Sequence, residues 1–166
     1  MSERRVVITG IGCITPLGND LTTTWDGLKE GRSGITTITN IDPTPFECKI
    51  AGEIKNFTAD PYFGMPKDAR RSDRYVQFAV AASKMAMEDS GVDVSKMDPR
   101  RFGVMVGSGI GGLSTLEREH TTYLEKGPKR VSPFTIPMMI SNIASGIISM
   151  EFGLFGPNMV DRKSVV

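Results

Sequence analysis

The sequence predicts an α/β fold, and three observations carry this expectation. Two short runs of β-branched and apolar residues, 5–10 and 102–107, each end in glycine and are typical of buried strands. Between them, residues 68–90 carry apolar side chains at a spacing of three to four, as in a helix that covers a sheet. Residues 137–151 are nearly all apolar or small, which predicts a helix buried on both sides.

The first strand leads through a glycine-rich loop into a short helix. Asn19 or Asp20 suits the N-cap of this helix, and Gly31 suits its end. Its apolar residues fall on one face: Leu21, Trp25 and Leu28. Residues 32–66 contain four prolines, so we expect an irregular segment without a long helix.

The helix at 68–90 is expected to end at Gly91. The residues of its core-facing stripe are Tyr75, Phe78, Ala82, Met85 and Ala86. After the second strand, a polar helix is expected at 113–125, and Pro137 suits the first turn of the last helix. A helix that is buried on both sides needs a layer of secondary structure packed on each side. A chain of this length is therefore expected to be too short to cover its own core.

Composition narrows the class of protein. A chain of 166 residues has room for one domain or for half of a larger one. A net charge of +1 with 23% charged residues does not point to nucleic acid as a partner. The sequence starts without a signal-peptide pattern and has no apolar run of transmembrane length, so we expect a cytoplasmic protein without a membrane partner.

Two cysteines and one histidine are the candidate reactive side chains. Cys13 and Cys48 lack the spacing of a metal site or a disulfide framework, so both are expected to be reduced and buried. Cys13 lies on a glycine-rich loop, but no base can be assigned to it as a nucleophile. His120 lies mid-helix without a cysteine or serine partner and is expected to be an exposed surface residue.

Two further patterns each have a structural and a functional interpretation. Gly107-x-Gly109-x-x-Gly112 follows a strand and precedes a helix, as in a dinucleotide-binding motif, but the acidic residue expected about 20 positions later is missing. Glycines that allow close backbone packing explain this motif as well. We name the second pattern the basic triplet: Lys67, Arg70 and Arg71. It is either a solvated helix face or a docking surface for an acidic protein.

The chain ends in a change of pattern. A Gly-Pro turn leads into the apolar-compatible residues 158–160, which predict the start of a buried strand. Residues 161–163 are all charged and are not expected to continue it, because unpaired buried charge is costly. Residues 161–166 are therefore interpreted as a non-native tail.

Together, several separated motifs resemble one family, the β-ketoacyl-acyl carrier protein synthases, and most closely their type II form. In order, they are RRVVITGIG at 4–12, PLG at 16–18, GRSGI at 31–35, GSGIGG at 107–112, SPF at 132–134 and GLFGP at 153–157. The resemblance covers residues 3 to about 160 and displaces the dinucleotide interpretation. It implies that residues 1–160 are the N-terminal half of a thiolase-like α-β-α-β-α fold.

The resemblance also implies an activity, decarboxylative Claisen condensation that elongates a fatty acid. The family moves an acyl group from acyl carrier protein to a cysteine and joins it to malonyl-acyl carrier protein. Two histidines assist, no metal or other cofactor is needed, and the substrate arrives on a phosphopantetheine arm. The full-length enzyme is expected to be a homodimer. Whether the pathway makes fatty acids or polyketides stays open.

Three parts of the sequence match functional positions of the family. The basic triplet matches the patch that receives carrier protein. Ile110 lies where the family has a gating residue of the acyl tunnel. Thr135 lies where the type II enzyme commonly has an aromatic residue near the tunnel end, across the dimer interface, which leaves the acyl-length preference open.

The nucleophile of the family is expected eight residues after Pro157, where this sequence has Val165. Both catalytic histidines belong to the second half of the family fold. The chain is therefore expected to lack all three catalytic side chains and to be inactive. Residues 161–166 followed by a stop are what GATCGGAAGAGCGTCGTGTAG encodes, so a translated sequencing adapter is one hypothesis for their origin. Alternatives are a catalytically inactive decoy or scaffold that binds carrier protein, or a nucleotide-binding module.

Overall fold

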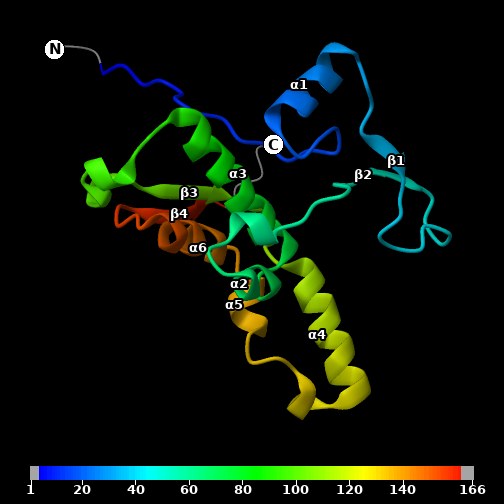
Figure 1. The fold of residues 1–166 in the computed structure, drawn as a ribbon. Helices are drawn as coiled ribbons and strands as arrows, with labels where there is room; N and C mark the ends of the chain where they lie inside the picture. Colours follow the sequence, from blue (N-terminus) through cyan, green and yellow to red (C-terminus); the bar gives the residue numbers. More distant parts are fainter. Residues whose placement is uncertain (1–3, 162–166) are drawn as a thin grey trace. The chain divides into compact units, whose positions relative to one another are not determined.

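The computed structural model describes residues 4–161 and confirms the α/β class (Figure 1). The chain divides into two compact units. Unit 1 comprises Met1–Thr58 and Ala82–Val92, and unit 2 comprises Ala59–Ala81 and Asp93–Val166.

In unit 1, helix α1 (Leu21–Lys29) begins and ends as expected. The carboxylate of Asp20 accepts a hydrogen bond of 2.8 Å from the backbone N–H of Thr23, which satisfies a donor of the first turn. Gly31 follows the helix with a φ of +66°, a conformation that favours glycine. The apolar face of α1 is exposed, while Thr24 and Gly27 are buried.

The strand expected at 5–10 is not formed, and Val6 and Ile8 are 91% and 82% exposed. A strand needs a neighbouring strand for its backbone groups, and no described segment pairs with these residues. The segment instead lies against the C-terminal half of helix α3 (Arg74–Ser90). A Cβ added to Gly10 or Gly12 would collide with the backbone of that helix, and the N–H of Ile11 donates to Asp89.

Residues 32–66 contain no long helix, as their prolines predict, but the segment is not wholly irregular. Strands β1 (Ile35–Thr37) and β2 (Ile50–Gly52) pair antiparallel, with Ile35 opposite Gly52. Such a short pair gives little hydrophobic alternation, which is why the sequence pattern did not reveal it.

The single helix predicted at 68–90 is two helices, α2 (Pro66–Arg70) and α3 (Arg74–Ser90). Side chains satisfy the backbone groups at the break. Ser72 donates to the carbonyl of Asp68, and Gln77 donates to the carbonyls of Ala69 and Ser72. These local hydrogen bonds replace those of a continuous helix.

The buried face of α3 also differs from the predicted stripe. Its fully buried residues are Val76, Val80 and Ala81, while the five predicted residues are half-buried. Tyr75 and Phe78 lie between the buried face of α3 and its solvent-exposed face, and each contacts a polar group there. The Tyr75 hydroxyl donates to the carbonyl of Ile140, and the Arg74 guanidinium lies 4.9 Å from the centre of the Phe78 ring.

Unit 2 is built on a parallel pair of strands, β3 (Val104–Gly107) and β4 (Asn158–Asp161). Val104 lies opposite Asn158, and Gly107 opposite Asp161. Strand β4 thus includes Asp161, one residue beyond the predicted run, and the carbonyl of Asp161 accepts from the N–H of Ser108 at 3.0 Å. Pairing through the backbone leaves the Asp161 side chain exposed, so its charge is not buried.

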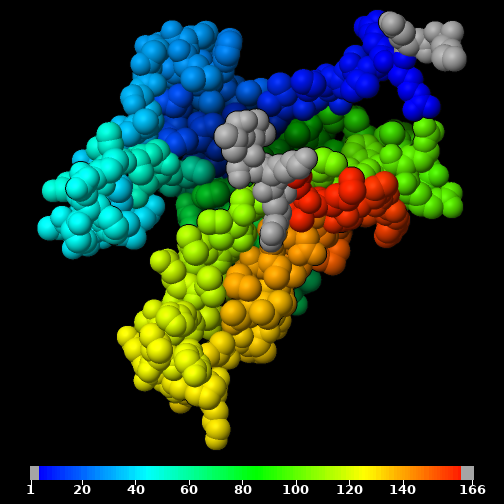
Figure 2. All heavy atoms as spheres, turned by 180° about the vertical axis from the view of Figure 1, so that it is seen from behind, coloured from blue at the N-terminus to red at the C-terminus, as the bar shows by residue number. Residues whose placement is uncertain are grey.

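Three helices connect the two strands: α4 (Leu113–Lys126), α5 (Thr135–Met139) and α6 (Ile143–Phe152). Short 3₁₀ turns lie at Asp60–Tyr62, Val94–Lys96, Pro99–Arg101 and Pro128–Arg130. Helix α6 packs on both β3 and β4, and α4 packs against α5. Figures 1 and 2 both show α4 in yellow-green beside the orange segment that contains α5.

The last helix predicted, 137–151, is also two helices, and Pro137 lies inside α5. Helix α6 buries one face, through Ala144, Ser145 and Ile148, while Met150 is 73% exposed. The prediction of burial on both sides was wrong. Asn158 joins α6 to β4: its amide accepts from the Ser145 hydroxyl and donates to the Ser145 carbonyl.

Candidate functional site

A hollow of about 400 Å³ in unit 2 contains the predicted gating residue Ile110. One wall comes from the loop before α4 and its first turns, the other from residues 139–142, and Val160 of β4 contributes as well. The lining residues are Ile110, Gly112, Leu113, Leu116, Met139, Ile140, Ser141, Asn142 and Val160. Ile110 itself is 69% exposed. The lining is mainly apolar, as a binding site for an aliphatic chain requires.

The glycine-rich loop 107–112 brings the two walls into direct contact. The N–H of Gly112 donates to the carbonyl of Met139 at 2.9 Å. A Cβ added to Gly111 would collide with the carbonyl of Met139, and one added to Gly112 with the carbonyl of Met138; Gly111 has a φ of +86°. Of the three motif glycines, Gly112 thus serves close backbone packing, whereas a Cβ added to Gly107 or Gly109 would meet open space.

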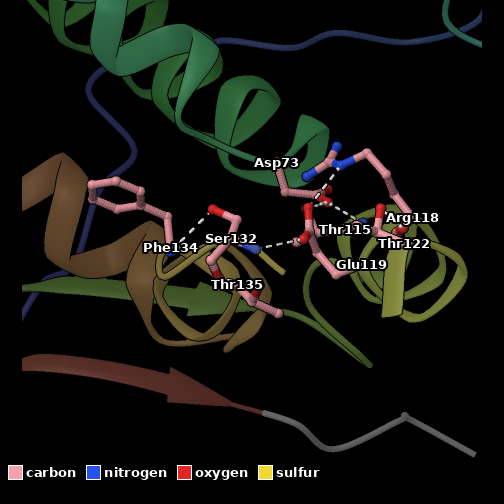
Figure 3. Close-up of polar contacts among 8 residues, drawn as sticks. All are labelled: Asp73, Thr115, Arg118, Glu119, Thr122, Ser132, Phe134 and Thr135. Carbon is pink, nitrogen blue, oxygen red and sulfur yellow. Dashed lines mark hydrogen bonds and ion pairs between the residues drawn. The ribbon is translucent and has the colours of Figure 1, made fainter. Parts of the chain in front are cut away.

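Thr135 is the first residue of α5 and is not among the residues that line the hollow. Its hydroxyl donates to the carbonyl of Ser132 at 2.6 Å. Figure 3 shows it within a chain of polar contacts that extends to α4. The described structure therefore does not bring Ile110 and Thr135 together into one lining.

Glu119 anchors the segment before α5 to α4. Its side chain accepts from the N–H of Ser132 at 2.9 Å and forms an ion pair with Arg118 (Figure 3). The Ser132 N–H and, secondarily, the Arg118 guanidinium hold the pKa of the Glu119 carboxyl below its ordinary value. The carboxylate fixes the position at which α5 begins.

The basic triplet is exposed, with Lys67 and Arg70 on α2 and Arg71 at its C-terminal cap. The Arg71 guanidinium lies 5.1 Å from the centre of the Phe134 ring, so this cation is oriented by a cation–π contact. Arg71 and Phe134 belong to a second groove, of about 450 Å³, whose other lining residues are Asp68, Ser72, Ile147, Met150 and Glu151. The three cations are thus available to solvent on one short segment.

Asp73 is a buried carboxylate that lies just before α3. Its Oδ2 accepts from the N–H of Thr115 at 3.0 Å and from the Thr115 hydroxyl at 2.6 Å (Figure 3). Tyr75, two residues later, donates to the carbonyl of Ile140 at 2.6 Å. Burial, with a smaller contribution from the charge of Asp73, raises the pKa of Tyr75 to about 12.

The remaining candidate side chains do not form a reactive centre. His120 is exposed, as predicted. Cys13 is half-buried and Cys48 is exposed, so the prediction that both are buried was wrong; Cys48 lies in the loop that joins β1 to β2. Within residues 4–161 no three potential ligands gather into a metal site. Val165, at the expected nucleophile position, lies outside the described residues.

None of the helices in the described part of the chain is long and apolar enough to cross a membrane.

Comparison with known proteins gives a match over nearly the whole chain. Residues 3–161 match the family model described as "Beta-ketoacyl synthase, N-terminal domain". The chain is 45% identical over 94% of its length to 3-oxoacyl-[acyl-carrier-protein] synthase 2 of Staphylococcus aureus (strain COL). It is 46% identical over 95% of its length to the protein of the same name from Synechocystis. It spans 37% and 38% of the length of these two relatives.

Solved structures agree with the sequence match. The ishigamide ketosynthase/chain length factor superposes with a TM-score of 0.86 at 28% identity, over 96% of this chain and 40% of the other. A second solved structure is the AntDE:AntF complex, a type II PKS acyl-carrier protein with its ketosynthase. It superposes with a TM-score of 0.75 at 25% identity, over 92% of this chain and 40% of the other. This confirms the thiolase-like class that the motifs implied. The chain belongs to the beta-ketoacyl synthase family, whose N-terminal domain it carries at residues 3–161.

Proposed function

We propose that this chain is the N-terminal part of a 3-oxoacyl-acyl carrier protein synthase that elongates fatty acids. One observation carries the proposal: the chain is 45–46% identical to two synthases of that name over 94–95% of its length. The condensation of the parent enzyme starts when an acyl group passes from the carrier thiol to an enzyme cysteine. Malonyl-carrier protein then loses CO₂, and the resulting carbanion attacks the acyl thioester and releases the enzyme thiolate.

This half contributes binding surfaces rather than reacting groups in our proposal. The hollow beside Ile110 receives part of the acyl chain, since its lining is mainly apolar. The basic triplet receives the acidic carrier protein, because three exposed cations on one short segment can steer and orient such a partner. The phosphopantetheine arm of the carrier delivers the substrate, and no metal or other cofactor takes part.

The same proposal assigns a homodimer to the parent enzyme and a cytoplasmic location to the chain. The 166-residue chain is expected to be inactive by itself. It has one histidine, the exposed His120, whereas the family chemistry needs two histidines and a cysteine. Incubation with acyl- and malonyl-carrier protein should release no CO₂, whereas the Staphylococcus aureus relative serves as the active control.

Carrier-protein binding tests the role of the basic triplet. Binding of a bacterial holo-acyl carrier protein to the chain should weaken steeply as salt is raised, because the contact is between opposite charges. Replacing all three cations by glutamate should reduce the affinity at low salt by about tenfold or more. Isothermal titration calorimetry at two ionic strengths measures both effects.

A matched triple variant distinguishes a specific effect of the basic triplet on carrier-protein binding from a general effect of net charge. Lys96, Arg100 and Arg101 are exposed cations on two 3₁₀ turns elsewhere in unit 2, and their replacement by glutamate makes the same change in charge. The control variant should bind nearly as well as the original chain. Equal losses in the two variants would contradict docking at the basic triplet, and salt-independent binding would contradict an electrostatic contact altogether.

A further inference from the structure

The two walls of the Ile110 hollow are held from a single place, the start of helix α3. Asp73 lies just before this helix and Tyr75 is its second residue. Asp73 contacts the wall formed by α4, and Tyr75 contacts the wall formed by residues 139–142. The two contacts use different groups, a carboxylate and a phenol, and are made to different walls.

The contact with α4 is buried and made twice. Thr115 is fully buried, and both its N–H and its hydroxyl donate to the same oxygen of Asp73. Thr115 lies between Leu113 and Leu116, two residues that line the hollow. Asp73 therefore fixes the first turn of α4, because losing it would leave two buried donors without an acceptor.

The contact with the other wall is made at the end of α5. The carbonyl of Ile140 accepts from the Tyr75 hydroxyl at 2.6 Å, and Ile140 lines the hollow. This carbonyl also accepts from the N–H of Ile143, at the start of α6. Tyr75 thus holds the turn between α5 and α6 without lining the hollow itself.

The two walls also touch each other directly, through backbone. Gly112 donates to Met139, and an added Cβ at Gly112 would come within 3.0 Å of the Asp73 carboxylate. Because Gly112 has no side chain, it cannot hold the walls further apart or pack between them. Together with this backbone contact, the Asp73 and Tyr75 contacts fix the separation of the walls.

We infer that Asp73 and Tyr75 are positioning residues that set the width of the Ile110 hollow, and thereby the acyl chains that it accepts. The inference rests on the proposed acyl-binding role of the hollow. Neither residue touches the acyl chain; each acts through the wall that it holds.

Two variants test the inference in the 166-residue chain. Tyr75→Phe removes only the hydroxyl, and Asp73→Asn places an amide where both Thr115 groups need an acceptor. The affinities for octanoate, dodecanoate and hexadecanoate are measured by displacement of a fluorescent fatty-acid probe. A looser wall widens the hollow, so Tyr75→Phe should raise the affinity ratio of hexadecanoate to octanoate by up to about fivefold, the most that one neutral hydrogen bond to the wall can contribute.

Amide hydrogen exchange by NMR supplies a readout that is independent of any ligand. Exchange at Thr115 should be about tenfold faster or more in Asp73→Asn, and exchange at Gly112 should be faster in both variants. The amide of Val104, which donates to Pro157 in the strand pair, should not change. Faster exchange at Val104 as well would show a general loss of stability and would overturn the positioning role.

Matched controls are Tyr123→Phe on α4 and Asp60→Asn, two exposed positions in unit 2. Both should keep the original affinity ratio. If Tyr75→Phe and Asp73→Asn keep it too, the inference is overturned while the proposed function stands. If the original chain binds none of the three fatty acids, the proposed acyl role of the hollow is contradicted, and exchange at Gly112 and Thr115 alone decides whether the two residues hold its walls.

Discussion

Glu53 lies buried next to strand β2 and is the hydrogen-bond centre of the loop that follows β1. It accepts from the N–H and the hydroxyl of Thr39 and from the N–H of Asn40, at 2.7–3.0 Å. These donors, with the Thr39 hydroxyl first, hold the pKa of the Glu53 carboxyl below its ordinary value. The charged form is therefore the form that the fold prefers.

Glu53→Gln should destabilise the chain in a pH-dependent way. Because the pKa of Glu53 is lower in the folded state than in the unfolded state, its stabilising contribution is complete above the unfolded pKa. It is lost as the pH falls through the folded pKa. The difference in unfolding free energy between the original chain and the variant should thus be largest near neutral pH and should shrink in acid.

Urea unfolding over a range of pH measures this difference. Glu47→Gln is the control, since Glu47 is exposed in the same unit and no hydrogen bond defines its position. If the difference in unfolding free energy between the original chain and Glu53→Gln stays constant with pH, the result would contradict a stabilising role of the charged Glu53 carboxylate.

At the residue scale, the sequence could name candidates for the site but not the residues that hold its walls. Ile110 and the basic triplet were named because their positions match those of the family; both are accessible, and their roles stay predictions. Asp73 was not found, because its partner Thr115 lies in another helix, 42 residues away. Threonine is common on polar helices, so nothing in the local pattern of α4 indicates that this one is buried.

At the scale of elements, helix boundaries set by local chemistry were predicted well. The Asp20 cap, the glycine after α1 and the glycine after α3 all depend on residues within a few positions. Strand pairing depends on distant residues, so the apolar run at 5–10 looked like a strand without having a partner in the described structure. The breaks at 71–73 and 140–142 were missed because side-chain hydrogen bonds from other turns stabilise them.

Asp20→Ala should cost about 1 kcal/mol in the stability of the unit that contains α1, because the N–H of Thr23 loses its acceptor. Circular dichroism during urea unfolding detects this change. Asp20→Asn is the matched control, because asparagine caps helices nearly as well as aspartate and should cost much less. Equal losses in the two variants would show that charge, rather than the cap, is what matters.

At the scale of the whole molecule, large apolar side chains remain exposed along much of the described chain. The more exposed ones include Val6, Ile8, Met105, Ile110, Met150 and Phe155. The apolar face of α1 adds Trp25, at 58%, and Leu28, at 56%. Surfaces of this kind favour association with another apolar surface.

We therefore expect the chain to self-associate as its concentration rises. Sedimentation velocity should show a growing average mass, and the fluorescence of Trp25, the single tryptophan, should shift to shorter wavelength if the α1 face is covered. Leu28→Glu should weaken the association, whereas Thr22→Glu, on an exposed polar position of α1, should not. A chain that stays monomeric at high concentration would contradict this expectation.

The parallel pairing of β3 with β4 has a consequence for how the chain folds. All of α4, α5 and α6 lie between the two strands, so their ladder closes a long loop, and the conformational entropy of that loop is lost before the hydrogen bonds form. Topologies with such distant contacts fold slowly compared with helical bundles. The helices of unit 2, whose contacts are more local, can therefore form before the strands that they connect, and strand pairing comes late in the folding of this unit.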